Sequence, residues 1–296
     1  MYQHIAQNKR RTWVLLAVFV ALVVALDYVM ARAFHQPALS VPILVVGFAY
    51  AAISYYFSAN IALAASGAKA VTKAQAPEVY RAVENLTIAS GLPMPGVYLI
   101  DDPSPNAFAT GRDPQHAAVA VTTGLMRLLD KSELEGVLAH ELSHVGNYDI
   151  RYMGLVMALV SVVSLIADLF LRLSFWGGGD DDSPSSGGQL FFVLGIVGAL
   201  LAPLVASVIQ MAVSRQREYL ADASGALLTR HPDGLARALE KIGAYAENRP
   251  MAHANSATAP LYIANPLSGK TLASLFDTHP PIADRVARLR EMDNRS

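Results

Sequence analysis

The sequence predicts a mainly α, α+β protein that is integral to a membrane, with four transmembrane helices and a cytosolic domain containing a small β-sheet. Composition is the first reason, since 53% of the 296 residues are hydrophobic and only 16% are charged. That balance is too apolar for an ordinary soluble chain of this length. The second reason is that the apolar residues gather in long runs, which cover residues 13–30, 38–57, 154–171 and 190–213.

Each run approaches or exceeds the ~20 residues with which a helix crosses the hydrocarbon core of a bilayer. Asp27 and Asp168 are the only charged residues inside them. Two alternatives remain open. The first run follows a basic segment and could be a cleavable signal peptide, although it is longer than the usual apolar core of such peptides. The last two runs could be buried core helices.

Lysine and arginine near the ends of the runs predict the orientation. They gather at residues 9–11, 69–73, 151 and 215–217, which share one side if the chain crosses four times. We therefore expect both termini and the polar segments in the cytoplasm, with the lipid bilayer as a partner. We expect a transmembrane hairpin at residues 1–60 and the first part of a cytosolic catalytic domain at residues 61–153. A second transmembrane hairpin, with an outside loop at residues 174–189, is expected at residues 154–213, and the second part of the domain at residues 214–296.

The segment His140-Glu141-Leu142-Ser143-His144 is the most informative motif. Two histidines four residues apart lie on one face of a helix, which suits two ligands of a tetrahedral zinc ion. Glu141 is then placed to act as a general base towards water. A capping box of Ser132 and Glu135 is expected to start this helix at about Glu133. The alternative is that both histidines are ordinary surface residues of a helix.

A catalytic zinc site takes three protein ligands, so a third must come from elsewhere. The best candidate is Glu218, which lies in a breaker-free run with Asp222 four residues later on the same helix face. Asp222 would accept the free ring N–H of a ligand histidine and fix its tautomer. An exposed helix with charge pairs is the alternative.

Four blocks together resemble the HtpX-type heat-shock membrane metalloproteases, which are related to the CAAX prenyl proteases. The blocks are the HELSH segment, its extension through residue 150, the run at residues 214–222, and His279-Pro280-Pro281 followed by Arg285. The resemblance implies a zincin-like catalytic domain with one Zn²⁺ per chain, held by His140, His144 and Glu218, with Glu141 as base. It also implies misfolded or damaged membrane proteins, or other unfolded polypeptides, as substrates in a bacterial inner membrane under stress.

Two further groups complete the predicted cleft. Asn106, Ala107, Phe108 and Ala109 lie between probable strands at residues 96–101 and 117–122, which we expect to form a small hairpin or sheet. An exposed sheet edge binds extended peptides through the main chain, and the resembled family uses such a segment in this way. A plain turn is the alternative.

His279 and Arg285 are candidates for stabilising an oxyanion, carried over from the family pattern. A structural ion pair explains Arg285 equally well. The sequence does not decide between a helix-end role and a role beside the metal for Asp149. The other histidines lie in polar or loop-like contexts and receive no functional role.

Other functions are weighed against an endopeptidase. A CAAX-type prenyl protease would carry more membrane spans, and a non-catalytic protein with structural zinc would need a fourth protein ligand. The chain has no cysteine, so any zinc must use nitrogen and oxygen ligands. A net charge of −1 without a basic stripe gives no case for nucleic acid as a partner.

Overall fold

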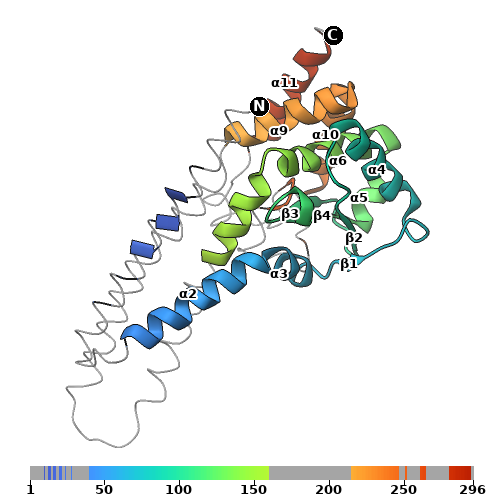
Figure 1. The fold of residues 1–296 in the computed structure, drawn as a ribbon. Coiled ribbons are helices and arrows are strands. Elements are labelled where there is room, and N and C mark those ends of the chain that lie inside the picture. Colours follow the sequence, from blue (N-terminus) through green and yellow to red (C-terminus); the bar gives the residue numbers. More distant parts are fainter. Residues whose placement is uncertain are drawn as a thin grey trace, which may run out of the picture.

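The computed structural model describes residues 40–159, 215–246, 251, 261–264 and 280–294, together with isolated positions between residues 10 and 28. A mixed four-stranded sheet lies at its centre, in the order β1-β2-β4-β3 (Figure 1). The strands are β1 (Lys69–Ala70), β2 (Gly96–Ile100), β3 (Ala107–Gly111) and β4 (Ala117–Thr122). β2 and β4 run parallel, whereas β1 pairs with β2 and β3 with β4 in antiparallel fashion.

The predicted strands at residues 96–101 and 117–122 are therefore neighbours in a sheet and not the arms of a hairpin. β3 arises from the segment predicted as a substrate-binding edge and pairs with β4 as the last strand of the sheet, with Ala107 opposite Val121. The intervening residues form a strand because the small, aromatic and β-branched side chains from 107 to 110 can be buried on both faces of the sheet.

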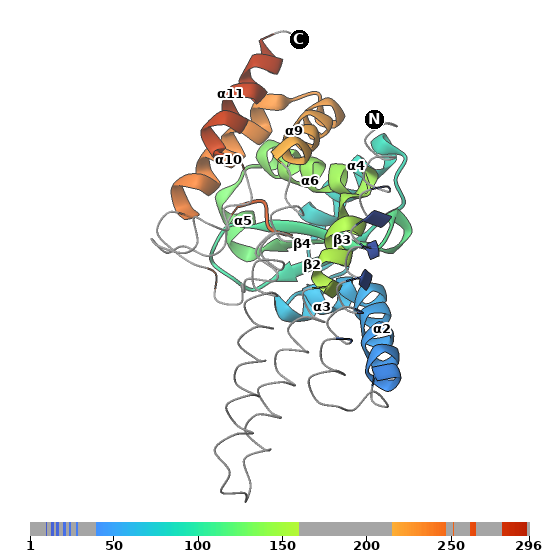
Figure 2. The same ribbon diagram turned by 90° about the vertical axis from the view of Figure 1, so that its left-hand side faces the viewer.

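Side chains alternate between the two faces of the sheet, as the period of a strand requires. Val119 and Val121 join the larger core, whereas Ala118 and Ala120 join a smaller one on the opposite face. The larger core is covered by α4 (Pro77–Ser90), α6 (Lys131–Gly146), α9 (Arg215–Thr229), α10 (Pro232–Ala246) and α11 (Ile282–Asp293). The smaller core is covered by α3 (Ser58–Ala65). Figure 2 shows α6 and α9 above the sheet and α3 below it.

Helix boundaries follow local signals. α4 begins at Pro77 and ends at Ser90, and its C-cap Gly91 has a φ of 70°, which suits a residue without a side chain. The start of α6 was predicted from the wrong residues. Asp130 is the N-cap, its carboxylate accepts from the N–H of Glu133, and the Glu133 carboxylate accepts from the N–H of Asp130. The capping box is thus Asp130 with Glu133, and the aspartate side chain caps the helix two residues before Ser132.

The second apolar run forms α2 (Ser40–Tyr56), which projects away from the sheet (Figure 1). Among the described helices, none is by itself both long and apolar enough to cross a bilayer. α2 and α3 together meet the length and composition required, although they are bent by 70° at the break between them. The fourth apolar run and the outside loop lie outside the described residues, as do most of the first and third runs.

Candidate active site

α6 carries the two histidines and the glutamate of the HELSH segment into the interior. His140 and Glu141 are each 1% exposed, and Nε2 of His140 lies 3.2 Å from Nε2 of His144. The rings meet edge to face, with centroids 4.8 Å apart. The predicted spacing thus places two imidazole nitrogens side by side within the core, and not on an exposed helix face.

α9 brings Glu218 to these rings. Its carboxylate oxygens lie 3.7 Å from Nε2 of His140 and 3.6 Å from Nε2 of His144. The approach depends on Gly225, where a Cβ atom would come within 2.9 Å of the backbone nitrogen of His140. A glycine at this position therefore lets α9 lie directly against α6, and Glu218 reaches the histidines from there.

The outer nitrogen of each imidazole faces a carboxylate. Nδ1 of His140 lies 2.9 Å from Asp222, and Nδ1 of His144 lies 3.0 Å from Asp149. When each ring donates its Nδ1–H to its carboxylate, both Nε2 atoms present lone pairs to the same space beside Glu218. Two acceptors at 3.2 Å with a carboxylate next to them repel one another unless a proton or a metal ion lies between them. This donor set therefore fits a metal ion.

Burial shapes the charges of the site. It lowers the pKa of His140. Burial acts in the same direction on His144, but Asp149 and Glu218 outweigh it and raise the pKa of His144 to about 9. In the absence of a cation these carboxylates hold a proton on His144, so metal binding must release that proton.

Glu141 points towards the sheet. Its carboxylate accepts a hydrogen bond from the backbone N–H of Ala109 on β3. Burial raises the pKa of Glu141 to about 7, against the opposing effect of His144. A carboxylate whose pKa lies near neutrality can both accept and return a proton at physiological pH. Glu141 thus has the properties that a general base needs.

Asp149 reaches His144 because the chain reverses just after α6. The helix ends at Gly146, and Tyr148 adopts a φ of 61°, which is unusual for a residue with a side chain. Asp149 then begins the helical segment of residues 149–159 and lies under the end of α6. Sequence reasoning left this residue undecided, since a tyrosine gives no sign that it will adopt a left-handed conformation.

Arg285, on α11, is fully buried and forms a bidentate pair with Asp222. Its Nη2 donates to Asp222 at 2.7 Å, and its Nε donates to the second carboxylate oxygen at 2.9 Å. The same guanidinium lies 3.7 Å from Glu218. Arg285 thus forms a buried ion pair that ties α11 to α9, as the structural alternative for this residue proposes. His279, the other candidate for an oxyanion role, lies outside the described residues.

The predicted substrate edge lies at the end of the sheet, but it is covered in part. Asn106, Ala107 and Phe108 are at most 3% exposed. The N–H of Ile263 donates to the carbonyl of Ala107 at 3.0 Å, and the Asn106 amide donates to the carbonyl of Ala264 at 2.9 Å. Asn106 therefore contacts the protein's own main chain, and residues 261–264 occupy the end of β3 that begins at Ala107.

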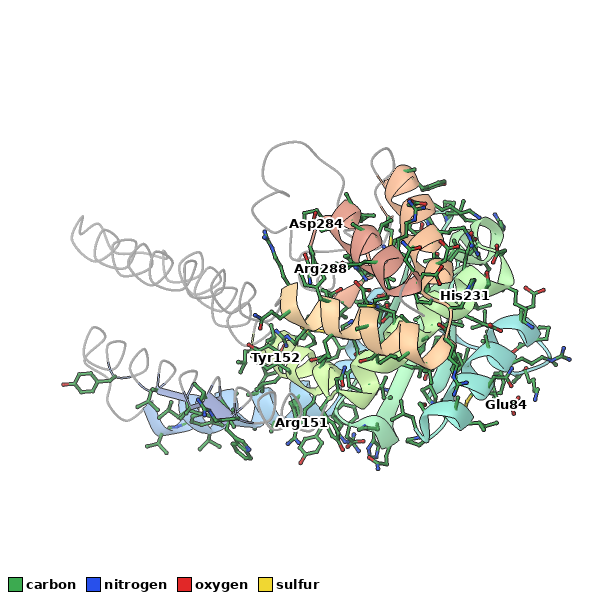
Figure 3. All side chains as sticks on the ribbon, turned by 90° about the horizontal axis from the view of Figure 1, so that it is seen from above. Glu84, Arg151, Tyr152, His231, Asp284 and Arg288 are labelled. Carbon is green, nitrogen blue, oxygen red and sulfur yellow. The ribbon has the colours of Figure 1, made fainter. Side chains whose placement is uncertain are left out.

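Cation–π contacts hold α9 on either side of Glu218. Arg217 lies 4.4 Å from the ring centroid of Tyr152, and Arg288 lies 3.8 Å from that of Tyr219. Figure 3 labels Tyr152 beside α9 and Arg288 on α11. Both partners belong to other helical segments, so these contacts fix α9 relative to α11 and to residues 149–159.

Two histidines from an HExxH helix and a glutamate from a second helix define the centre of a metalloprotease. The model of peptidase family M48 matches residues 73–293, and the chain belongs to this family. It is 47% identical over 296 residues to a "Protease HtpX homolog" of Tropheryma whipplei (strain Twist), and the alignment covers 100% of this chain and 99% of the relative. It is 44% identical over 301 residues to the protein of the same name from Streptococcus uberis, with 99% and 100% covered. The predicted HtpX-type resemblance is confirmed.

A solved structure supports the fold. The crystal structure of S. mikatae Ste24p matches with a TM-score of 0.53 and 19% identity, over 94% of this chain and 66% of that chain. At this identity the likeness concerns the fold alone.

Proposed function

We propose that this chain is a zinc-dependent integral-membrane endopeptidase that degrades misfolded or damaged membrane proteins. The observation that carries the proposal is the meeting of Glu218 with the Nε2 atoms of His140 and His144, next to a buried Glu141. These three ligands would hold one zinc ion per chain. They come from the parts of the chain that precede and follow the second predicted hairpin.

The number of ligands favours a catalytic ion over a structural one. Within the described residues, the cluster of possible ligands has three members, and a structural zinc site takes four. Nitrogen and carboxylate donors without cysteine suit zinc. A bound zinc ion supplies Lewis acidity, which polarises the scissile carbonyl and lowers the pKa of water.

The protein's own side chains transfer the proton and position the imidazoles. Glu141 takes a proton from the attacking water as oxygen bonds to the carbonyl carbon, and returns it to the amine when the C–N bond breaks. The N–H of Ala109 holds the Glu141 carboxylate in place. Asp222 and Asp149 fix the two imidazoles, and Arg285 positions Asp222 through the bidentate pair.

The substrate class follows from the HtpX-type resemblance together with the apolar runs. An unfolded segment can bind at the β3 edge through hydrogen bonds to its main chain, which place little demand on its side chains. The distribution of lysine and arginine places the catalytic domain and both termini on the cytoplasmic side of a bacterial inner membrane. Membrane-protein segments would therefore meet the site close to where they leave the bilayer.

The test uses the full chain purified in detergent with a chelator. Addition of zinc should restore cleavage of casein and of an unfolded membrane protein. Glu141→Gln should retain one zinc per chain and lose cleavage, whereas Glu135→Gln, a partly exposed glutamate of the same helix, should behave as the wild type. Full activity in the Glu141→Gln protein would contradict the proposed mechanism.

A further inference from the structure

We propose that α3 lies in the interfacial layer of the bilayer, so that this helix alone separates the sheet of the protease domain from the lipid. The proposal depends on the membrane function proposed above and specifies the depth at which the domain sits. Three observations support the proposal: the outer surface of α2 and α3, the bend between these helices, and the residues at that bend.

The outer surface of α2 and α3 is uncharged and mostly apolar, with Asn60 as an exposed polar residue of α3. From residue 41 to residue 68 the sequence contains no charged residue, and Lys69 is the first to follow. Large hydrophobic side chains along this stretch are between 41% and 69% exposed: Val41, Val45, Val46, Ile53, Tyr56, Phe57 and Ile61. Such a continuous apolar surface marks a site of contact with an apolar partner.

The bend turns α3 towards the plane of the membrane. α2 and α3 meet at Phe57 and are inclined by 70° to one another. If α2 enters the bilayer near its normal, α3 must lie close to the membrane plane, as interfacial helices do. A helix of eight residues in that orientation covers the surface without crossing it.

α3 has apolar residues on two opposite sides, and among the described residues only one of these sides is covered by protein. Ala62 and Leu63 are buried beneath the sheet in the smaller core, together with Phe108 and Ala120. Ile61 and Ala64 face outward and are exposed. Because α3 continues the apolar surface of α2, lipid is the partner that fits both helices.

The residues at the bend match the boundary between lipid and water. Tyr55, Tyr56 and Phe57 are consecutive, and the rings of the two tyrosines lie 5.6 Å apart. The guanidinium of Arg112, from the end of the sheet, lies 5.6 Å from the Tyr56 centroid. Aromatic rings with nearby cations are typical of the headgroup layer, where anionic lipids attract the positive charge.

The position of β3 gives the proposal a consequence for substrates. Phe108 of β3 and Ala62 of α3 belong to the same small core, so one layer of helix separates the sheet edge from the lipid. A polypeptide that leaves the bilayer beside α3 needs to rise by little more than the width of a helix, about 10 Å, to reach β3.

The absence of cysteine allows a direct test by single-cysteine labelling. The variants Ile61→Cys and Ala64→Cys measure the membrane depth of α3, and Val45→Cys measures that of the middle of α2. Glu84→Cys is a control at the end of the domain far from α2 (Figure 3). Each carries an environment-sensitive fluorophore in vesicles of zwitterionic and anionic phospholipid, with quenchers placed at shallow or deep positions of the acyl chain. Val45 lies roughly 16 Å along the helix from Tyr56, near the expected middle of the bilayer.

We expect shallow quenchers to act most on the α3 labels, deep quenchers to act most on Val45→Cys, and neither to act on Glu84→Cys. Quenching at Val45→Cys with none at Ile61→Cys or Ala64→Cys would overturn the interfacial position and leave the membrane function intact. Quenching at none of the positions would overturn both. The two failures are thus distinguishable.

A functional measurement uses charge on the exposed side of α3. Ile61→Glu combined with Ala64→Glu should lower cleavage of a vesicle-anchored substrate several-fold and leave casein cleavage in detergent unchanged. Equal losses in both assays would show that these residues act through the fold and would contradict contact with lipid.

Discussion

Asp149 lies 3.0 Å from Nδ1 of His144, although it follows that histidine by five residues and belongs to the next helical segment. The left-handed conformation of Tyr148 makes this contact possible. It gives His144 the same support that Asp222 gives His140 from a distant helix. Both imidazoles are thus held by a carboxylate at the nitrogen that faces away from Glu218.

Removal of the Asp149 carboxylate should weaken metal binding. In Asp149→Ala we expect the dissociation constant for zinc to rise by about 10- to 100-fold, because the His144 ring loses both its orientation and its negative partner. Asp149→Asn should show a smaller loss, since it keeps an acceptor without the charge. Competition with a chromophoric chelator measures the effect. Zinc affinity equal to that of the wild type in Asp149→Ala would refute this role.

Replacement of Arg285 should destabilise the fold as well as the site. Arg285→Ala leaves Asp222 buried without its bidentate partner, which we expect to cost about 3–5 kcal/mol in the free energy of unfolding. Arg290→Ala is the control on the same helix, because its pair with Glu240 is exposed and should contribute at most about 1 kcal/mol. Denaturant unfolding in detergent compares the two, and equal losses would contradict the argument.

The distance between α9 and α6 is predicted to depend on Gly225. A methyl group added there would lie 2.9 Å from the His140 nitrogen, so Gly225→Ala must push the helices apart and move Glu218 away from the histidines. We expect cleavage to fall by at least about tenfold, since a displacement of 1 Å can cost ~100-fold in rate. Gly47→Ala in α2 is the control, because nothing lies within 4 Å of the added atom. Wild-type activity in the Gly225→Ala protein would disprove the close-approach argument.

Glu133 ties the start of α6 to α10. This carboxylate is 1% exposed and accepts a hydrogen bond from the backbone N–H of Asp130. It also accepts from the side chains of Lys241 at 2.7 Å and Arg237 at 3.4 Å. Glu133→Gln should therefore lower the free energy of unfolding by about 1–3 kcal/mol, the usual cost of leaving buried polar groups unsatisfied. The control Glu135→Gln, on the partly exposed side of α6, should change it by less than about 0.5 kcal/mol. Thermal unfolding of the zinc-loaded protein tests the difference.

The sequence predicted the helices of the site because their signals are local. Histidines four residues apart and a breaker-free run around Glu218 each act within a few turns of one helix. The parallel pairing of β2 with β4 and the contact between Arg285 and Asp222 depend on segments that are distant along the chain. Such relationships leave no periodic pattern, and the resemblance alone pointed to Arg285.

One error concerns the start of α6. Ser132 and Glu135 satisfy the spacing of a capping box, but Asp130 and Glu133 satisfy it two residues earlier with an equally good N-cap residue. The contact of the Asn106 amide with the carbonyl of Ala264 was not predicted, because no local signal indicates that residues 261–264 return to β3. The substrate-binding role of Asn106 stays a prediction.

The separation of the ligands between α6 and α9 has a consequence for synthesis. A nascent chain that has been translated only through α6 holds two of the proposed metal ligands and lacks the third. Glu218 and Asp222 are synthesised more than 70 residues after His144, and Arg285, the partner of Asp222, follows later still. The proposed mechanism therefore predicts that the protease is inactive until α9 and α11 have packed against α6.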